Sequence, residues 1–185
     1  MDLILSNLII GLSHLVILFL SIFITTNSIF PYEAFNFFPP FGVIVLGILF
    51  FGNKVILSII LSNFIYDYIS LYFFKISIFD NVFIITVSFS FCVPLTIFII
   101  NKLNFSIKIW PSYSFDKSNI YHVLILVCIS SITFLFISIF LMKLFDIDIK
   151  INHLFLGNIL GGVSLIILLK LLVNIPYQLK KLFKK

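Results

Sequence analysis

Charged and chemically reactive side chains are scarce in this sequence. Only 10% of its 185 residues are charged, none is arginine, and there are two cysteines and one tryptophan. It has no glycine-rich nucleotide loop and no grouping of nucleophile, base and orienting residue. Its three histidines are well separated and its carboxylates are scattered, which is not the spacing of metal ligands. We therefore expect no enzymatic activity, no metal or other cofactor, and no binding of nucleic acid.

The two cysteines, Cys92 and Cys128, lie inside apolar runs. A disulfide framework or a zinc site would need more such residues at motif spacing. We expect both to be small residues facing lipid or the protein core.

Apolar residues dominate instead. Hydrophobic residues make up 62% of the chain, 25 residues are phenylalanine, and the mean hydropathy is +1.26. A soluble domain of this size has too little interior to bury so much apolar surface. The apolar segments lack the alternation of barrel strands, so helices are the expected spanning elements. The predicted fold is an all-α integral membrane helical bundle.

Six apolar segments predict about six transmembrane helices in a single domain over residues 1–185. The second segment is short, and a basic cytoplasmic tail is expected over 174–185. The first segment is too long for a signal peptide and has no positive residues before it, so we expect it to be retained. The expected spans are 3–24, 40–51, 55–74, 82–100, 120–142 and 154–173.

Lysines predict the orientation. With both termini in the cytoplasm, the inner side carries eight lysines and the outer side three, as the positive-inside rule requires. We therefore expect a multi-pass protein of a bacterial inner (plasma) membrane. The inner lysines are Lys54, Lys102, Lys108, Lys117, Lys180, Lys181, Lys184 and Lys185, and the outer ones are Lys75, Lys143 and Lys150.

The longest inner connection, "NKLNFSIKIWPSYSFDKSN", covers residues 101–119. It combines lysines with the tryptophan and other aromatic residues, which is typical of a segment lying on anionic lipid headgroups. A surface for a protein partner is the alternative.

Four polar side chains at membrane depth are candidate functional residues: His14, Asn63, Asp67 and Asn158. Such residues face the bundle interior, a cavity or a partner. For His14 and the two asparagines, hydrogen bonds between helices are the alternative to a functional role. Asp67 follows Asn63 by four residues and so shares its helix face. It is either wet near the interface or binds a cation or polar ligand from outside.

Small residues mark one helix face in the last span. Gly157 and Gly161 form a G-x-x-x-G pattern, followed by Gly162, and this spacing lets helix backbones approach closely. It predicts a packing seam within the bundle, with a homo-oligomer interface as the alternative. Pro94 is expected to kink the fourth span.

The short second segment begins "NFFPPFG". We expect an extended chain through Phe38 and Pro39, because the residue before a proline avoids the α region. A helix should then start at Pro40, with Gly42 allowing a close backbone approach. About 13 residues give about 20 Å of helix, which is shorter than the bilayer core of about 30 Å.

The start of this helix should lie below the membrane surface, with exposed N–H groups and a positive dipole end. We predict that it forms the mouth of a ligand pocket. The alternative is a plain short helix beside an interfacial belt of phenylalanines.

The stretch "NFFPPFGVIVLGILFFGNKVILSIILSNFIYD" resembles the start of MASE1-type integral membrane sensory domains. The later stretches "FDKSNIYHVLILVCISSITFLFISIF" and "HLFLGNILGGVSLIILLKLL" are similar to that family's later loop and helices, so the resemblance covers residues 29–172. It implies a sensory or small-ligand-binding membrane module that acts through a partner protein. Because the family commonly has about eight spans and this chain has six, the resemblance implies no output activity in this chain.

Individual positions follow from the resemblance. Pro39, Pro40 and Gly42 match the family pattern, whereas Phe38 stands where the family has tryptophan and Asn158 where it usually has aspartate. These departures weaken a stacking role and remove a charge. The resemblance implies that ligand-binding residues lie at these positions.

Two other functions stay open. The size and the small-residue seam also suit the substrate-binding subunit of a vitamin-type transporter. A cell-envelope scaffold of the rod-shape type is the second alternative, because Asp67 ends the stretch "SNFIYD" where such proteins carry an acidic residue.

Overall fold

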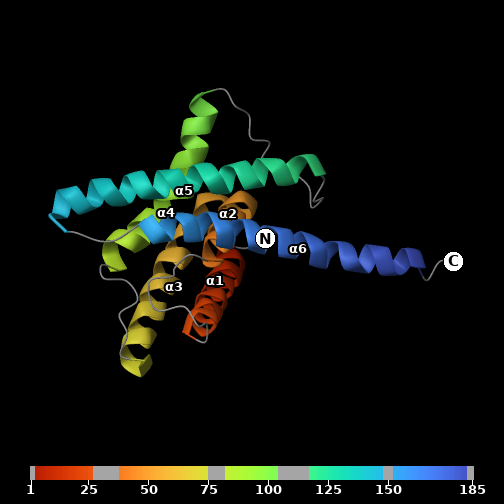
Figure 1. Ribbon diagram of the computed structural model, residues 1–185, viewed down its shortest axis with the longest axis horizontal. Helices are drawn as coiled ribbons and strands as arrows, with labels where there is room; N and C mark the ends of the chain where they lie inside the picture. Colours follow the sequence, from red (N-terminus) through yellow and green to blue (C-terminus); the bar gives the residue numbers. More distant parts are fainter. Residues whose placement is uncertain (1–2, 27–37, 75–81, 104–116, 148–151, 183–185) are drawn as a thin grey trace.

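The computed structural model describes residues 3–26, 38–74, 82–103, 117–147 and 152–182, and these contain helices and turns without any strand. Six α-helices follow one another along the chain (Figure 1). They are α1 Leu3–Thr26, α2 Pro40–Phe51, α3 Ile56–Ile69, α4 Val82–Lys102, α5 Lys117–Phe145 and α6 Asn152–Leu182.

Four helical stretches are long and apolar enough to cross a membrane. They are Leu3–Ser21, Pro40–Phe73, Phe83–Lys102 and Tyr121–Phe145, and Phe155–Lys170 is a shorter apolar helix. Large hydrophobic side chains cover the outside of the bundle, and only 22% of the first stretch is buried against protein. An outward apolar surface of this kind belongs in lipid, so the chain is a helical membrane protein.

The second and third predicted spans share the 34-residue apolar stretch Pro40–Phe73. Gly52 interrupts it, because its φ of +69° is a backbone conformation that only glycine adopts readily. No neighbouring atom would meet a Cβ there, so conformation and not space requires the glycine. A 3₁₀ turn over Gly52–Val55 then leads into α3, which ends in a π turn over Ser70–Phe74.

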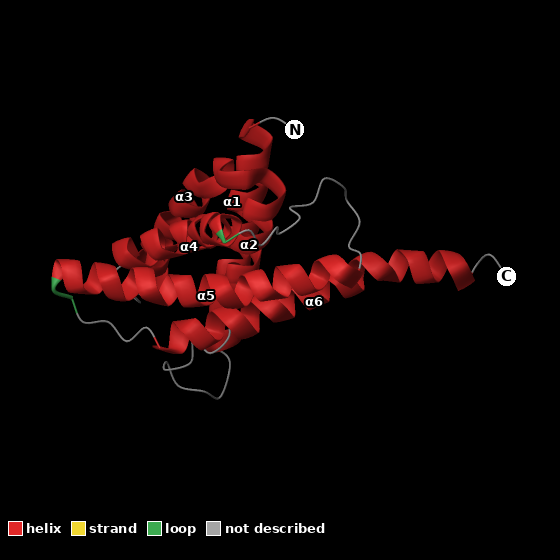
Figure 2. Cartoon of the chain, turned by 90° about the horizontal axis from the view of Figure 1, so that it is seen from above, coloured by secondary structure: helices red, strands yellow, loops and turns green. Residues whose placement is uncertain are grey.

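The short helix α2 forms the centre of the molecule. It packs against α1, α4, α5 and α6, and every residue from Phe38 to Leu49 is buried. Figures 1 and 2 show α2 between the α1 and α3 pair on one side and the α5 and α6 pair on the other. A 12-residue helix is about 18 Å long, so α2 is the core of the bundle and is too short to cross a bilayer alone.

The two longest helices, α5 and α6, run side by side and lie across α1 and α3 (Figures 1 and 2). α6 continues as a helix to Leu182, through most of the segment expected as a tail. Hydropathy marks where an apolar segment ends, and the helix outlasts it. The C-terminal part of α6 extends away from the other helices (Figure 1).

Polar side chains and aromatic rings join α4 to α5. The Thr96 hydroxyl lies 2.8 Å from that of Thr133, and Ser138 donates a 2.9 Å hydrogen bond to Ser88. The rings of Phe89 and Phe134 stack with centroids 4.5 Å apart. These contacts give the wall against which α2 starts. Both cysteines are free thiols.

Candidate functional site around the start of α2

The chain enters α2 through a tight turn. Pro39 has φ −56° and ψ −30°, which is the α region, so the expected extended conformation at Pro39 is wrong. The carbonyls of Phe38 and Pro39 accept hydrogen bonds from the N–H groups of Phe41 and Gly42, at 3.2 Å and 2.9 Å. These i to i+3 bonds, with packing against α6, hold Pro39 in a conformation that the following proline disfavours.

The start of α2 has no N–H groups to offer a ligand, contrary to expectation. Pro39 and Pro40 have none, and those of Phe41 and Gly42 are used in the turn. The N–H of Phe38 donates to the carbonyl of Gly157 in α6, at 2.8 Å. Inside a membrane protein every backbone group needs a partner, and the two prolines reduce that need. The helix dipole therefore acts here without free amide donors.

Glycines let α6 dock against this turn. A Cβ on Gly161 would come within 2.2–2.4 Å of Phe38 and Pro39 backbone atoms, so only glycine fits. A Cβ on Gly42 would lie 3.1 Å from the Gly162 carbonyl oxygen, which is the close approach expected there. Two motifs far apart in sequence, "FFPPFG" and "LGNILGG", thus form one contact surface.

His14 of α1 and Asn63 of α3 meet on another side of the same turn. The His14 Nε2 atom lies 3.0 Å from Asn63 Oδ1, and both side chains are buried. The backbone of Pro40 lies next to the imidazole ring. With the described residues, neither Nδ1 of His14 nor Nδ2 of Asn63 makes a hydrogen bond of good geometry. The pair therefore has hydrogen-bonding capacity left over.

Asn158 contributes a second buried polar group. It lies next to Gly157 and one helical turn before Gly161 and Gly162, so it belongs to the α6 surface that packs on α2 and α5. Its side chain is fully buried. Neither its Nδ2 nor its Oδ1 has a hydrogen-bond partner among the described residues. Ser130 on the neighbouring α5 is likewise buried with an unpartnered hydroxyl in the part of the chain described.

Asp67 lies on the same face of α3 as Asn63, one turn further on. It is only 7% exposed, so the alternative of a wet carboxylate near the interface is wrong. Its neighbour Tyr66 is also buried and packs edge-on against Phe19 of α1, with ring centroids 5.3 Å apart. Asp67 therefore belongs to the buried polar face of α3.

Phe38 is part of an aromatic stack. Its ring lies parallel to that of Phe89, with centroids 5.0 Å apart, and Phe89 continues the stack to Phe134. Phe38 is 2% exposed. It therefore anchors the turn in the protein core and offers no open face for stacking on a ligand. The neighbouring residues Phe35 and Phe37 lie outside the described ranges.

Sequence reasoning missed the buried hydroxyls of Ser70, Thr86 and Ser130, which lack partners within the described residues. Most serines and threonines here bond the carbonyl three or four residues earlier, as Ser90 and Ser131 do. Composition does not distinguish the two groups, because this bond depends on a side-chain rotation. Helical spacing places Ser70 on the same face as Asn63 and Asp67, and this was the available signal.

Unfilled hydrogen-bonding capacity around the start of α2 comes from uncharged groups. The asparagines offer amide N–H donors, Asn158 also offers a carbonyl acceptor, and His14 offers one ring nitrogen of either kind. The site chemistry suits a small polar molecule that both donates and accepts hydrogen bonds. The assignment of Phe38, Pro39, Pro40, Gly42, Asn63, Asp67 and Asn158 as ligand-binding residues stays a prediction.

Comparisons with known proteins gave no relative. No protein-family model matches the chain, and no curated protein sequence and no solved structure matches it. The resemblance to MASE1-type domains therefore stays a hypothesis that depends on the quoted motifs.

Proposed function

We propose that this protein is a membrane module that binds a small polar ligand at the start of α2 and acts through a partner protein, in the manner of a MASE1-like sensory domain. One observation carries the proposal. The amide of Asn158 is fully buried beside the docked turn, and neither of its polar atoms has a partner among the described residues.

The energetics favour a bound molecule at this amide. A buried polar group without a partner costs about 1–3 kcal/mol, and the lipid around the bundle supplies no hydrogen bonds. A leucine at position 158 would avoid that cost. A small ligand with a donor and an acceptor would satisfy both atoms of Asn158, and the free positions of His14 and Asn63 offer further contacts.

The resemblance to sensory domains gains support from one contact. Its two most specific motifs, the proline pair with Gly42 and the glycine cluster of α6, lie more than 100 residues apart in sequence. They touch through the Phe38 to Gly157 hydrogen bond and through Gly161. Motifs that resemble one family by chance would have no reason to meet in space.

A six-span arrangement with both termini in the cytoplasm fits the helix lengths. At 1.5 Å per residue, the 29 residues of α5 and the 31 of α6 give about 44 Å and 46 Å. These helices exceed the bilayer core and would tilt to fit it, which agrees with their course across α1 and α3. With α2 running from the bundle centre to an inner turn at Lys54, the lysine bias is satisfied.

Ligand binding is tested by identifying what the protein retains. The tagged protein is purified in mild detergent, and small molecules are extracted and compared by mass spectrometry between wild type and Asn158→Leu. The control variant is Leu160→Ala, a change on the exposed side of the same helix. We expect a molecule that is retained by wild type and the control and lost in Asn158→Leu. Equal small-molecule content in all three would contradict the proposal.

The partner is tested by cross-linking in cells followed by purification. A histidine kinase or cyclase-type protein in the eluate would support the sensory role. A complex containing a transport ATPase, with uptake that depends on it, would favour the transporter alternative. A normal cell shape after deletion would argue against a scaffold. Only lipids and chaperones in the eluate would contradict action through a partner.

A further inference from the structure

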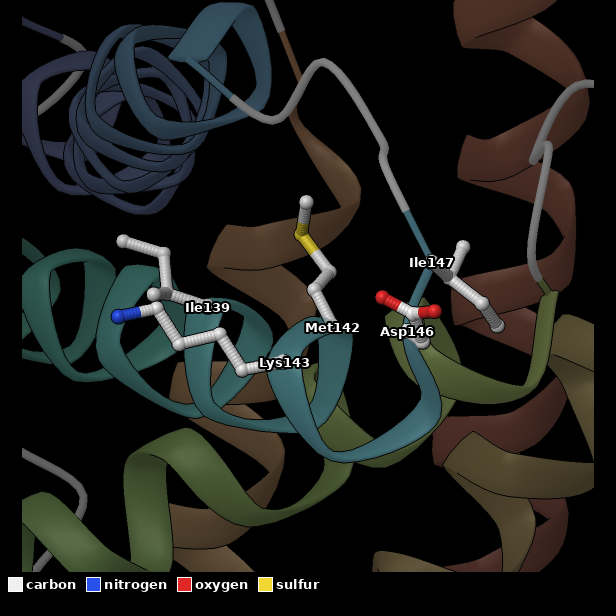
Figure 3. Close-up of a pocket in the computed structure, with 5 residues that line it drawn as sticks. All are labelled: Ile139, Met142, Lys143, Asp146 and Ile147. Carbon is white, nitrogen blue, oxygen red and sulfur yellow. The ribbon is translucent and has the colours of Figure 1, made fainter.

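The C-terminal end of α5 carries a second candidate site, unrelated to the start of α2. An open hollow of about 310 Å³ lies there, lined by Ile139, Met142, Lys143, Asp146 and Ile147 (Figure 3). The apolar stretch Tyr121–Phe145 ends at this point, so the hollow stands where the hydrocarbon core gives way to lipid headgroups.

Two opposite charges border the hollow without pairing. Within the part of the chain that the structure describes, neither Lys143 nor Asp146 forms an ion pair, and both are exposed. Figure 3 shows the Lys143 ammonium group beside Ile139 and directed away from the Asp146 carboxylate, with Met142 between them. The separated charges leave both available to a third group that carries charges of both signs.

The backbone fixes Asp146 in place. Its φ of +53° makes it the only non-glycine residue with positive φ among those described. The N–H of Ile147 donates to the Met142 carbonyl at 3.0 Å, which is the helix-ending bond of a Schellman motif with Asp146 where glycine is usual. Strained positions of this kind cluster at binding sites. An aspartate in place of glycine sets a carboxylate at the rim of the hollow.

The floor of the hollow is apolar and anchored. Met142 and Ile147 pack with the fully buried Ile84 of α4 in one hydrophobic cluster. The Phe145 ring packs edge-on against Phe83 of α4, with centroids 6.0 Å apart. The end of α5 is therefore held against α4, and the hollow is part of the fold.

We propose that this hollow binds a zwitterionic phospholipid of the phosphatidylethanolamine class. Lys143 contacts the phosphate, Asp146 contacts the ammonium group, and an acyl chain lies along Ile139 and Met142. The position at the end of an apolar stretch, the apolar floor and the two unpaired charges together match this headgroup and its chain. This site is independent of the function proposed above.

The test measures lipid selectivity by native mass spectrometry. The purified full chain is incubated with an equimolar mixture of phosphatidylethanolamine and phosphatidylglycerol, and bound lipids are counted. We expect wild type to favour phosphatidylethanolamine. Lys143→Gln should reduce retention of both lipids by about five-fold. Asp146→Asn should lower the selectivity ratio by about three-fold and leave phosphatidylglycerol binding in place.

Asparagine tolerates the left-handed conformation, so Asp146→Asn keeps the helix end intact. The control is Lys102→Gln at the end of α4, where the lysine contacts only the Phe98 ring in the described part of the chain. This control should behave as wild type. Soluble phosphoethanolamine should not displace the lipid, because it lacks the chain. Unchanged selectivity in both site variants, or displacement by phosphoethanolamine, would overturn the proposal.

Discussion

The backbone N–H of Phe38 donates a 2.8 Å hydrogen bond to the carbonyl of Gly157, across more than 100 residues of sequence. This bond ties the start of the central helix α2 to α6. Around it lie a glycine surface, an aromatic stack and buried amides with unused hydrogen-bonding groups. The first three predictions below test how this junction holds the bundle together, and the last tests what it is for.

The glycine surface predicts a steep cost for one added methyl group. In Gly161→Ala the new Cβ would overlap Phe38 and Pro39 backbone atoms, which cannot move without shifting α2. We expect the free energy of unfolding to fall by about 3 kcal/mol or the protein to fail to assemble. The matched control is Gly11→Ala, whose Cβ would lie 3.3 Å from the Ser58 Cβ. Denaturation in mixed micelles, or size-exclusion chromatography, reports the difference. Equal behaviour of the two variants would contradict the docked geometry.

The His14 and Asn63 pair predicts energetic coupling. Replacing either one by leucine leaves a buried polar partner without its bond, so each single variant should lose about 1–2 kcal/mol of stability. The double variant His14→Leu, Asn63→Leu should lose less than the sum, with a coupling of about 0.6–1.5 kcal/mol. A double-mutant cycle of unfolding free energies measures this. Strict additivity would show that the two side chains do not interact.

The aromatic stack predicts a large cavity effect. Phe89 is fully buried between Phe38 and Phe134. Phe89→Ala should therefore cost about 3–5 kcal/mol. Phe91→Ala on the same helix is the control, because Phe91 is 47% exposed on the outer surface and should change stability little in lipid or detergent. Thermal denaturation of the two purified variants gives the comparison, and similar melting temperatures would count against a core role for the stack.

Part of this fold could be predicted from local sequence. The proline pair indicates a helix start at Pro40, and α2 begins there. Small residues at Gly42 and Gly161 indicate close backbone approach, and both positions have it. These predictions succeed because proline and glycine act through backbone geometry, which depends on few neighbours.

The remaining features depend on partners that local sequence does not identify. The pairing of His14 with Asn63 requires the rotation of α1 against α3. The N–H group of Phe38 was expected to be free, and its partner lies in α6. Asp67 was open to being wet, and packing of α3 buries it. Each outcome was set by helix–helix packing in space.

The most direct test of the proposed ligand site is the sign of one stability change. With bound small molecules removed, Asn158→Leu deletes an amide that has no partner among the described residues and adds apolar contact. The account predicts that the free energy of unfolding stays equal to wild type or rises by about 1 kcal/mol, while the co-purifying molecule is lost. A fall of about 2 kcal/mol, with no molecule retained by wild type, would show that Asn158 is a structural residue and contradict the account.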